Sequence, residues 1–300
     1  MVVAALAVPV ALCATLLGPP ARAQSVAGGW TASMQDIRRV AGLIPGRRSL
    51  RLNMLTFAES RRTKNFAVKG APADPSVQAR TAFQVMYSDG SVMVDAGMSL
   101  AVHSFFGRGV DEPYYPDAAE QVNRALADAK LIVVTHEHGD HVAGVIDSSL
   151  ADQLAPKTLL TRAQVDRLIA SPQMPEIALT ADRARRFVVV DYDSYFPLAP
   201  GIALVKAAGH TPGSQMVYIG LESGREYLLI GDATWHMDGV REMVGKDAPW
   251  VTEDAEAVLD QLRWLNGLSR TDPDLVVVAS HDREQHEALI QQGVLAHRLE

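Results

Sequence analysis

The chain gathers four metal-binding side chains in the six-residue run His136-Glu137-His138-Gly139-Asp140-His141, directly after the apolar stretch 131–134. Zinc favours imidazole and carboxylate ligands, and the alternating spacing lets His136 and His138 point together while Asp140 and His141 serve a neighbouring position. Side chains of this kind beside a core strand are costly to desolvate unless something pairs with them. The run therefore predicts metal binding rather than a solvated polar loop.

Three further residues repeat this context later in the chain. His210 lies beside turn glycines, and Asp232 and His281 each follow an apolar stretch of strand length. Each of them alone has an ordinary interpretation as a polar loop residue or a hydrogen-bonded structural histidine. Together, and in this order, they favour one shared metal site.

The elements that must position these residues alternate between strands and helices. Apolar runs predict strands, and apolar residues at helical spacing predict helices, so the pattern indicates layered sheets covered by helices in the α/β (α+β) class. An Asp89-Gly90 turn joins the first two strands as a hairpin. We expect strands near 83–87, 92–94, 131–134, 158–160, 186–190, 202–206, 216–220, 227–230 and 275–279, and helices near 117–130, 161–170 and 252–268.

The ordered set of seven residues resembles the metallo-β-lactamase superfamily over roughly residues 80 to 290. The resemblance implies a four-layer αββα sandwich with two metal ions, zinc or in its place manganese, iron or cobalt, at one edge of two packed sheets. It implies that one ion is held by His136, His138 and His210, that the other is held by Asp140, His141 and His281, and that Asp232 bridges them.

The same resemblance implies a role for two aspartates. Asp95, in Asp95-Ala96-Gly97, matches an early strand motif whose aspartate supports the metal ligands from behind. Two ions can share a hydroxide, lower its pKa and polarise the carbonyl that it attacks. Asp140 is then a catalytic candidate that orients the hydroxide or moves a proton to the leaving group.

The N-terminal part of the chain predicts export. Residues 1–23 combine a continuous apolar block with an Ala-x-Ala pattern, which favours a cleaved secretory signal peptide over a membrane anchor. We expect a periplasmic or secreted protein with no stable membrane insertion after cleavage. Residues 24–48 are interpreted as a leader with one short helix, and 49–300 as a single hydrolase domain. The only cysteine, Cys13, lies in the signal segment.

Composition narrows the substrate. The 300 residues are 48% hydrophobic and carry a formal net charge of −7, which argues against nucleic acid because a nucleic-acid binder needs a basic face. A small molecule fits better. Among the superfamily's branches, enzymes that act on glutathione adducts inside cells do not suit an exported protein.

The ligand set most resembles that of the lactonase-like branch, which opens acyl-homoserine lactones. Related aryl-ester and organophosphate hydrolases are the alternative. True β-lactamases resemble the chain less, because one class needs a cysteine ligand and another has no bridging aspartate. From a different class, a metal-binding protein without catalysis stays open.

One position departs from the lactonase pattern. Those enzymes carry a tyrosine three residues beyond the bridging aspartate, and this chain has Trp235 there, followed by His236. The hydroxyl that would stabilise an oxyanion is therefore missing. His236 is a catalytic candidate in its place, with a structural histidine as the alternative.

Two segments are candidates for the substrate pocket. The expected loop 100–116 contains Phe105, Phe106 and Tyr114, and the expected loop 235–250 begins with Trp235. Aromatic side chains beside a metal edge suit an apolar acyl or aryl group. The same side chains are compatible with sealing the core or with a homodimer contact. The remaining histidines have no partner spacing and are expected at the surface: His103, His286 and His297.

Overall fold

The computed structural model describes residues 29–300. The signal segment 1–23 and the first residues of the leader lie outside the described residues, so export stays a prediction. Among the helices of residues 29–300, none is both long and apolar enough to cross a membrane.

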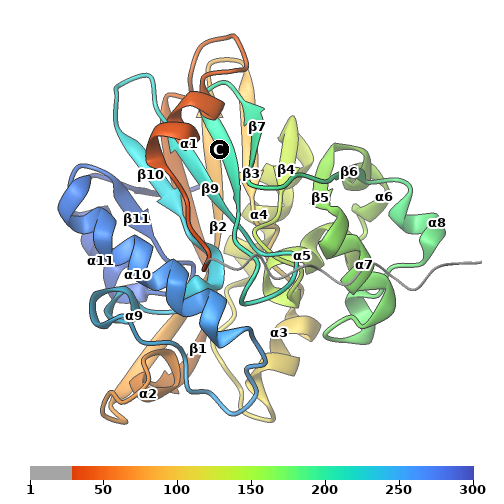
Figure 1. Cartoon of the computed structure of the whole chain (residues 1–300). Helices are drawn as coiled ribbons and strands as arrows, with labels where there is room; N and C mark the ends of the chain where they lie inside the picture. Colours follow the sequence, from red (N-terminus) through yellow and green to blue (C-terminus); the bar gives the residue numbers. More distant parts are fainter. Residues whose placement is uncertain (1–28) are drawn as a thin grey trace, which may run out of the picture.

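Two mixed β-sheets form the centre of the molecule (Figure 1). The first has the strand order β12-β1-β2-β3-β4-β5-β6 and the second the order β11-β10-β9-β8-β7. The strands of the first sheet are β1 Arg51–Thr63, β2 Pro75–Tyr87, β3 Gly90–Val94, β4 Leu131–Val133, β5 Thr158–Thr161, β6 Val188–Val190 and β12 Ala296–His297. Those of the second are β7 Tyr195–Ala199, β8 Ile202–Lys206, β9 Gln215–Gly220, β10 Glu226–Leu229 and β11 Val276–Val278.

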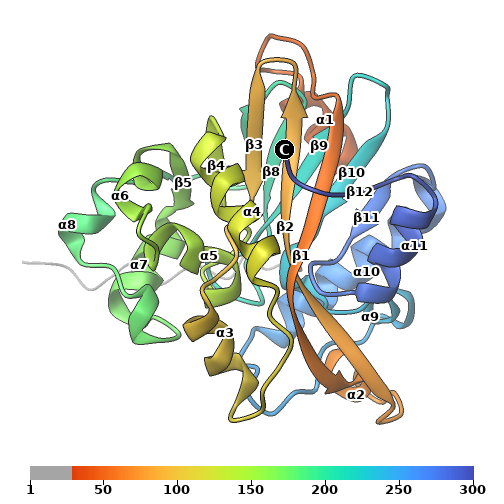
Figure 2. The ribbon, with the colours of Figure 1, turned by 180° about the vertical axis from the view of Figure 1, so that it is seen from behind.

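Helices cover the outer faces of both sheets. In Figure 1, α1 and α10 lie in front of the second sheet, and Figure 2, from behind, shows α4 and α5 in front of the first. The longer helices are α1 Met34–Ala41, α3 Leu100–Gly107, α4 Pro116–Asp128, α5 Gly139–Ile146, α7 Arg162–Ala170, α9 Met237–Glu242, α10 Ala255–Thr271 and α11 Arg283–Gln291. Short turns of helix are α2 Lys64–Ala67, α6 Ala151–Leu154 and α8 Ala181–Ala184.

Three apolar layers hold these elements together. Val85 and Val133 of the first sheet pack against Val217 of the second, which closes the sheets face to face. Val122 of α4 belongs to a cluster on the outer side of the first sheet. Ile37 of α1 belongs to a cluster on the outer side of the second. The predicted four-layer αββα arrangement is thus confirmed, and α1, within the expected leader, packs into it.

Local sequence explains where several helices begin. Pro116 occupies the first turn of α4, where its missing N–H costs no hydrogen bond. Asp254 caps α10 by accepting a hydrogen bond from the Ala257 N–H. The segments 100–116 and 235–250, expected as loops, each contain a helix, α3 and α9. Ser99 caps α3 through the Val102 N–H, a signal that the loop prediction overlooked.

The first sheet begins earlier than the sequence pattern indicated. β1 was not predicted, and β2 extends well before the expected 83–87. Polar residues interrupt the apolar pattern of β1, among them Asn53, which is fully buried and donates to the Gln84 side chain at 3.3 Å. This buried polar contact joins β1 to β2 by a hydrogen bond rather than by apolar packing, so hydrophobic periodicity does not reveal it.

The expectation that three histidines lie at the surface was wrong for two of them. His103 and His286 are both buried, whereas His297 is exposed. The rings of the buried pair face backbone carbonyls, with His103 Nε2 3.3 Å from Glu112 O and His286 Nε2 2.7 Å from Ala279 O. A buried imidazole needs such an acceptor, and sequence spacing does not show which distant carbonyl supplies it.

Helix α5 lies close to the loop after β3 at Gly144, so we expect a larger side chain at this position to destabilise the protein. A Cβ at Gly144 would lie 2.0 Å from the Ala96 carbonyl oxygen. We expect Gly144→Ala to lower the free energy of unfolding by about 3 kcal/mol, measured by urea titration. The matched control is Gly267→Ala in α10, where nothing lies within 4 Å. It should raise stability by roughly 0.5–1 kcal/mol. Equal midpoints for Gly144→Ala and wild type would contradict the close approach.

His286 predicts a pH dependence of stability. Burial lowers its pKa from 6.5 to about 4 in the folded protein. The unfolded chain therefore binds the proton more readily, and stability present above pH 6.5 is lost as the pH falls toward 4. Between pH 7 and pH 5 the wild type should lose about 2 kcal/mol more of its unfolding free energy than His286→Gln. Identical pH dependence in urea titrations of both proteins would show that this ring does not contribute.

Candidate metal centre

The predicted ligands converge at one edge of the two sheets because each follows the end of a strand. His136 and His138 lie between β4 and α5, and His138 is the residue that precedes the first turn of α5. Asp140 and His141 belong to that first turn. The remaining three come from the second sheet, where His210 follows β8, Asp232 follows β10 and His281 follows β11.

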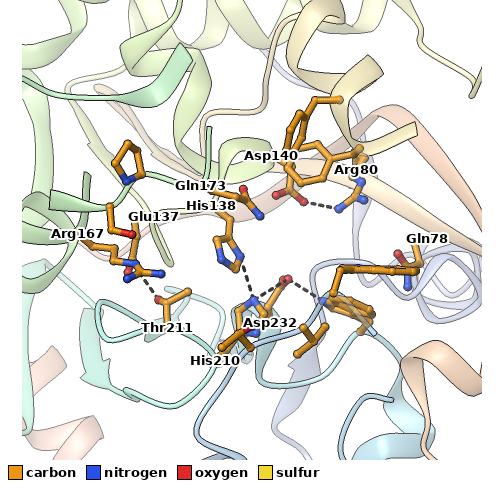
Figure 3. A pocket seen from close by; sticks show the side chains of 18 of the residues that line it. Gln78, Arg80, Glu137, His138, Asp140, Arg167, Gln173, His210, Thr211 and Asp232 are labelled. Atoms are coloured by element: carbon orange, nitrogen blue, oxygen red, sulfur yellow. Dashed lines mark hydrogen bonds and ion pairs between the residues drawn. The ribbon is translucent and has the colours of Figure 1, made fainter. Parts of the chain in front are cut away.

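These residues form three overlapping clusters, in each of which the ligand atoms lie within 4.8 Å of one another. Figure 3 shows His138, His210, Asp140 and Asp232 among the residues that line one cavity. The clusters are His136 with His138 and His210, Asp140 with His141 and His281, and His136 with His141 and Asp232. The first two are the triads that the resemblance implied, and the third links them.

The Asp232 carboxylate faces both triads. Its Oδ1 lies 3.1 Å from His281 Nε2 and 3.4 Å from His141 Nε2. Its Oδ2 lies 3.5 Å from His210 Nε2 and 3.8 Å from His136 Nε2. Oδ1 is buried and has no hydrogen-bond partner among residues 29–300. An orphaned buried carboxylate oxygen fits a site that receives a cation there.

The histidines of the first triad are in the state that a metal needs. Burial, reinforced by the neighbouring His210, lowers the pKa of His138 to about 3. Burial also holds the pKa of His136 and of His210 below its usual value. His138 Nδ1 faces His136 Nε2 and His210 Nε2, each at 3.1 Å. Three neutral imidazoles therefore direct ring nitrogens toward one point, which is the donor set that zinc prefers.

The second triad has the opposite charge pattern. Burial alone would raise the pKa of Asp140, but Arg80 and His141 outweigh it and hold that pKa well below its usual range. Burial likewise acts against the ionised Asp232, and His281 and His141 outweigh it. His141 responds in turn, because Asp140 and Asp95 raise its pKa despite burial. The surrounding carboxylates therefore favour a positive charge at this position.

Three ligands are oriented by a second contact on the ring nitrogen that faces away from the site. Asp95 accepts from His141 Nδ1 at 2.8 Å and from the Thr135 N–H at 2.7 Å, which matches the supporting position expected for it. Its backbone is left-handed, with φ 63°. His281 Nδ1 donates to Ala79 O at 2.7 Å. Such contacts set the tautomer and direct the other nitrogen at a metal.

The third of these contacts joins a buried charge network that sequence analysis missed. His210 Nδ1 lies 2.9 Å from Glu253 Oε2, and Lys246 Nζ lies 2.9 Å from the same oxygen. Lys246 also donates to Asp232 O at 2.7 Å. The Lys246 side chain is fully buried, which is unusual for lysine. Its sequence neighbours, Gly245 and Asp247, give no sign of this burial.

Arg80 is the second missed residue. It lies in the middle of β2, and its Nη1 donates to Asp140 Oδ2 and lies 3.4 Å from His281 Nε2. Figure 3 shows this pair beside the metal ligands. The only signal in the sequence is an arginine shortly before the apolar residues Ala82 and Phe83. Because β2 was predicted to begin later, that signal was not used.

A cavity of about 290 Å³ opens beside the ligands and is lined by Phe105, Phe106 and Trp235, three of the four side chains expected to bind substrate. Tyr114 is not part of its wall. The Tyr114 hydroxyl donates to Met98 O at 3.3 Å, and its ring packs against the core cluster under α4. The expectation for Tyr114 was wrong, because sequence proximity to Phe105 does not place it on the same face.

His236 also lies away from the lining of this cavity. Its Nδ1 accepts a hydrogen bond from the Asp238 N–H at 3.1 Å and so caps α9. This position is the structural alternative to the catalytic role considered from the sequence. Trp235 does line the cavity, but its indole N–H donates to Asp232 Oδ2 at 2.7 Å. It steadies a predicted ligand rather than offering its N–H to a substrate.

The model of the metallo-β-lactamase superfamily matches residues 81–281. An N-acyl homoserine lactonase from a Bacillus species is 24% identical over 213 residues, covering 66% of this chain and 78% of the relative. The lactonase AiiA of Bacillus thuringiensis subsp. kurstaki is 23% identical over 213 residues, covering 67% and 80%.

Solved structures show the same fold. A quorum-quenching N-acyl homoserine lactone lactonase superposes with a TM-score of 0.64 at 17% identity, covering 81% of this chain and 97% of that one. AidC, a dizinc quorum-quenching lactonase in complex with a product, gives 0.56 at 16%, covering 79% and 91%. The His and Asp clusters are those typical of a dizinc centre of this kind. With the family model spanning well over half of its length, the chain belongs to the metallo-β-lactamase superfamily.

Proposed function

We propose that this protein is a dinuclear zinc hydrolase that opens a small lactone or ester, with manganese, iron or cobalt as the alternative ions. The observation that supports it most directly is the Asp232 carboxylate, whose two oxygens face different triads. Two ions bound there would lower the pKa of a water that they hold and polarise a carbonyl. The relatives that match the chain are lactonases, which makes a lactone the first choice of substrate.

The chain's own residues supply the rest of the chemistry. Arg80 keeps Asp140 ionised, and Asp140 lines the cavity. An ionised carboxylate at this position can accept a hydrogen bond from an attacking water and orient it. Phe105, Phe106 and Trp250 form the apolar part of the wall, which suits the acyl part of a lactone or ester.

The metal content tests the dinuclear site directly. Wild-type protein purified with zinc should contain two zinc ions per chain, one for each triad, measured by elemental analysis. Asp232→Asn should retain fewer, because a neutral amide bridges two cations poorly. The matched control is His297→Gln, since His297 is exposed and lies outside the clusters. A wild type that binds one ion or none would contradict the dinuclear site.

Turnover tests the proposed reaction. Zinc-loaded wild type should open an N-acyl homoserine lactone and hydrolyse a 4-nitrophenyl ester. The first reaction is monitored through proton release and the second through absorbance. Asp140→Asn should lower kcat/KM by about 100-fold or more, because the amide does not orient water as a carboxylate does. His297→Gln should match wild type.

Phosphotriesters and β-lactams complete the panel of substrates. If the wild type with zinc or manganese opens none of the four classes, the proposal is wrong. If it opens β-lactams alone, the lactone assignment is replaced by that of a β-lactamase.

A further inference from the structure

Arginines line one side of the cavity although the chain carries a formal net charge of −7. We call Arg62, Arg80 and Arg108 the arginine wall. Arg108 Cζ lies 4.4 Å and Arg62 Cζ 5.9 Å from the centre of the Trp250 ring, and Arg80 Cζ lies 5.2 Å from that of Phe106. The three guanidinium groups thus share one pair of aromatic side chains beside the metal ligands.

The wall has more positive charge than its partners neutralise. Arg62 is paired with the buried Glu112. The partner of Arg80 is Asp140, whose charge the predicted metal site also uses. Arg108 is exposed, packs against Trp250 and forms no ion pair within the described residues 29–300. On the opposite side of the cavity, Arg167 lies near the carboxylate of Glu137 (Figure 3).

Gln78 adds an unused donor to the same side. Gln78 and Arg80 are two residues apart on β2, so their side chains share a face, and Figure 3 shows both on one side of the metal ligands. Both line the cavity and both are more than nine-tenths buried. Gln78 Nε2 and Arg80 Nε have no hydrogen-bond partner among residues 29–300. Buried donors without an acceptor are costly, so this wall fits an acceptor group from a ligand.

We infer that the substrate bears a carboxylate in addition to the lactone or ester bond that is opened, and that Gln78 and the arginine wall bind this carboxylate. The inference rests on the proposed function. An uncharged lactone would leave the buried Gln78 donor unpaired and the exposed Arg108 charge with water as its only partner. A carboxylate satisfies both, because guanidinium and amide N–H groups are its preferred donors. The aromatic rings of Trp250 and Phe106 pack against the guanidinium groups of the arginine wall.

A matched pair of esters tests the inference. 4-Nitrophenyl butyrate and mono-4-nitrophenyl glutarate share the scissile bond and differ by one terminal carboxylate. Zinc-loaded wild type should show a kcat/KM about tenfold higher for the glutarate ester, mostly through KM, and this preference should weaken at high salt. Equal or lower kcat/KM for the glutarate ester, with the butyrate turned over, overturns the inference and leaves the proposed function standing.

Variants locate the effect. Gln78→Met and Arg108→Gln should each reduce the preference for the glutarate ester by about five- to tenfold. The matched control is Arg124→Gln, which makes the same change of charge at an exposed position of α4, outside the cavity. A preference that survives in both cavity variants, or falls equally in Arg124→Gln, overturns the assignment to this wall.

A binding measurement keeps the inference separate from turnover. Trp235 and Trp250 line the cavity, so their fluorescence reports on its occupancy. Glutaramate, whose acyl end is an amide and whose other end is a carboxylate, should bind the wild type more tightly than butyramide, which has no carboxylate, and Gln78→Met should remove most of the difference. If neither ester is hydrolysed, the proposed function fails for esters, and this titration decides the inference alone. No difference between glutaramate and butyramide binding would overturn it.

Discussion

The burial of two carboxylates among five histidines is the constraint on which the rest of the structure depends. Asp140 and Asp232 stay ionised inside the protein only because positive or polar groups surround them, since an isolated buried charge is far too costly. Arg80, Lys246 and the histidines provide this surrounding, and they come from both sheets. The strand ends of the two face-to-face sheets must therefore lie close together at this place, and the apolar layer between the sheets holds them there.

The sequence predicted most of the fold and all of the clustered residues, because these signals are local. Each candidate ligand follows an apolar strand, and parallel strands bring their carboxyl ends to one edge. Arg80 and Lys246 escaped prediction because their roles depend on partners far away in the chain. Tyr114 lies away from the cavity for the same reason, since adjacency in sequence does not decide which face of a turn or helix a side chain occupies. His236 has the structural position that the sequence left open as the alternative.

The chain is related to N-acyl homoserine lactonases at low sequence identity. Identities of 23–24% accompany a shared fold. Trp235 stands where the resemblance to lactonases implies a tyrosine. Its indole N–H donates a hydrogen bond to the Asp232 carboxylate. A shared fold does not by itself fix the substrate, because the substrate is recognised by the side chains that line the site.

The Lys246–Glu253 ion pair fastens both ends of the loop that carries Trp250. Lys246 is attached to the Asp232 backbone and Glu253 to the His210 ring, while the residues between them reach the cavity. Replacements in the middle of this loop would leave both anchors, and so both ligands, in place. The loop is consequently a position at which evolution or an engineer can exchange substrate preference without rebuilding the metal site.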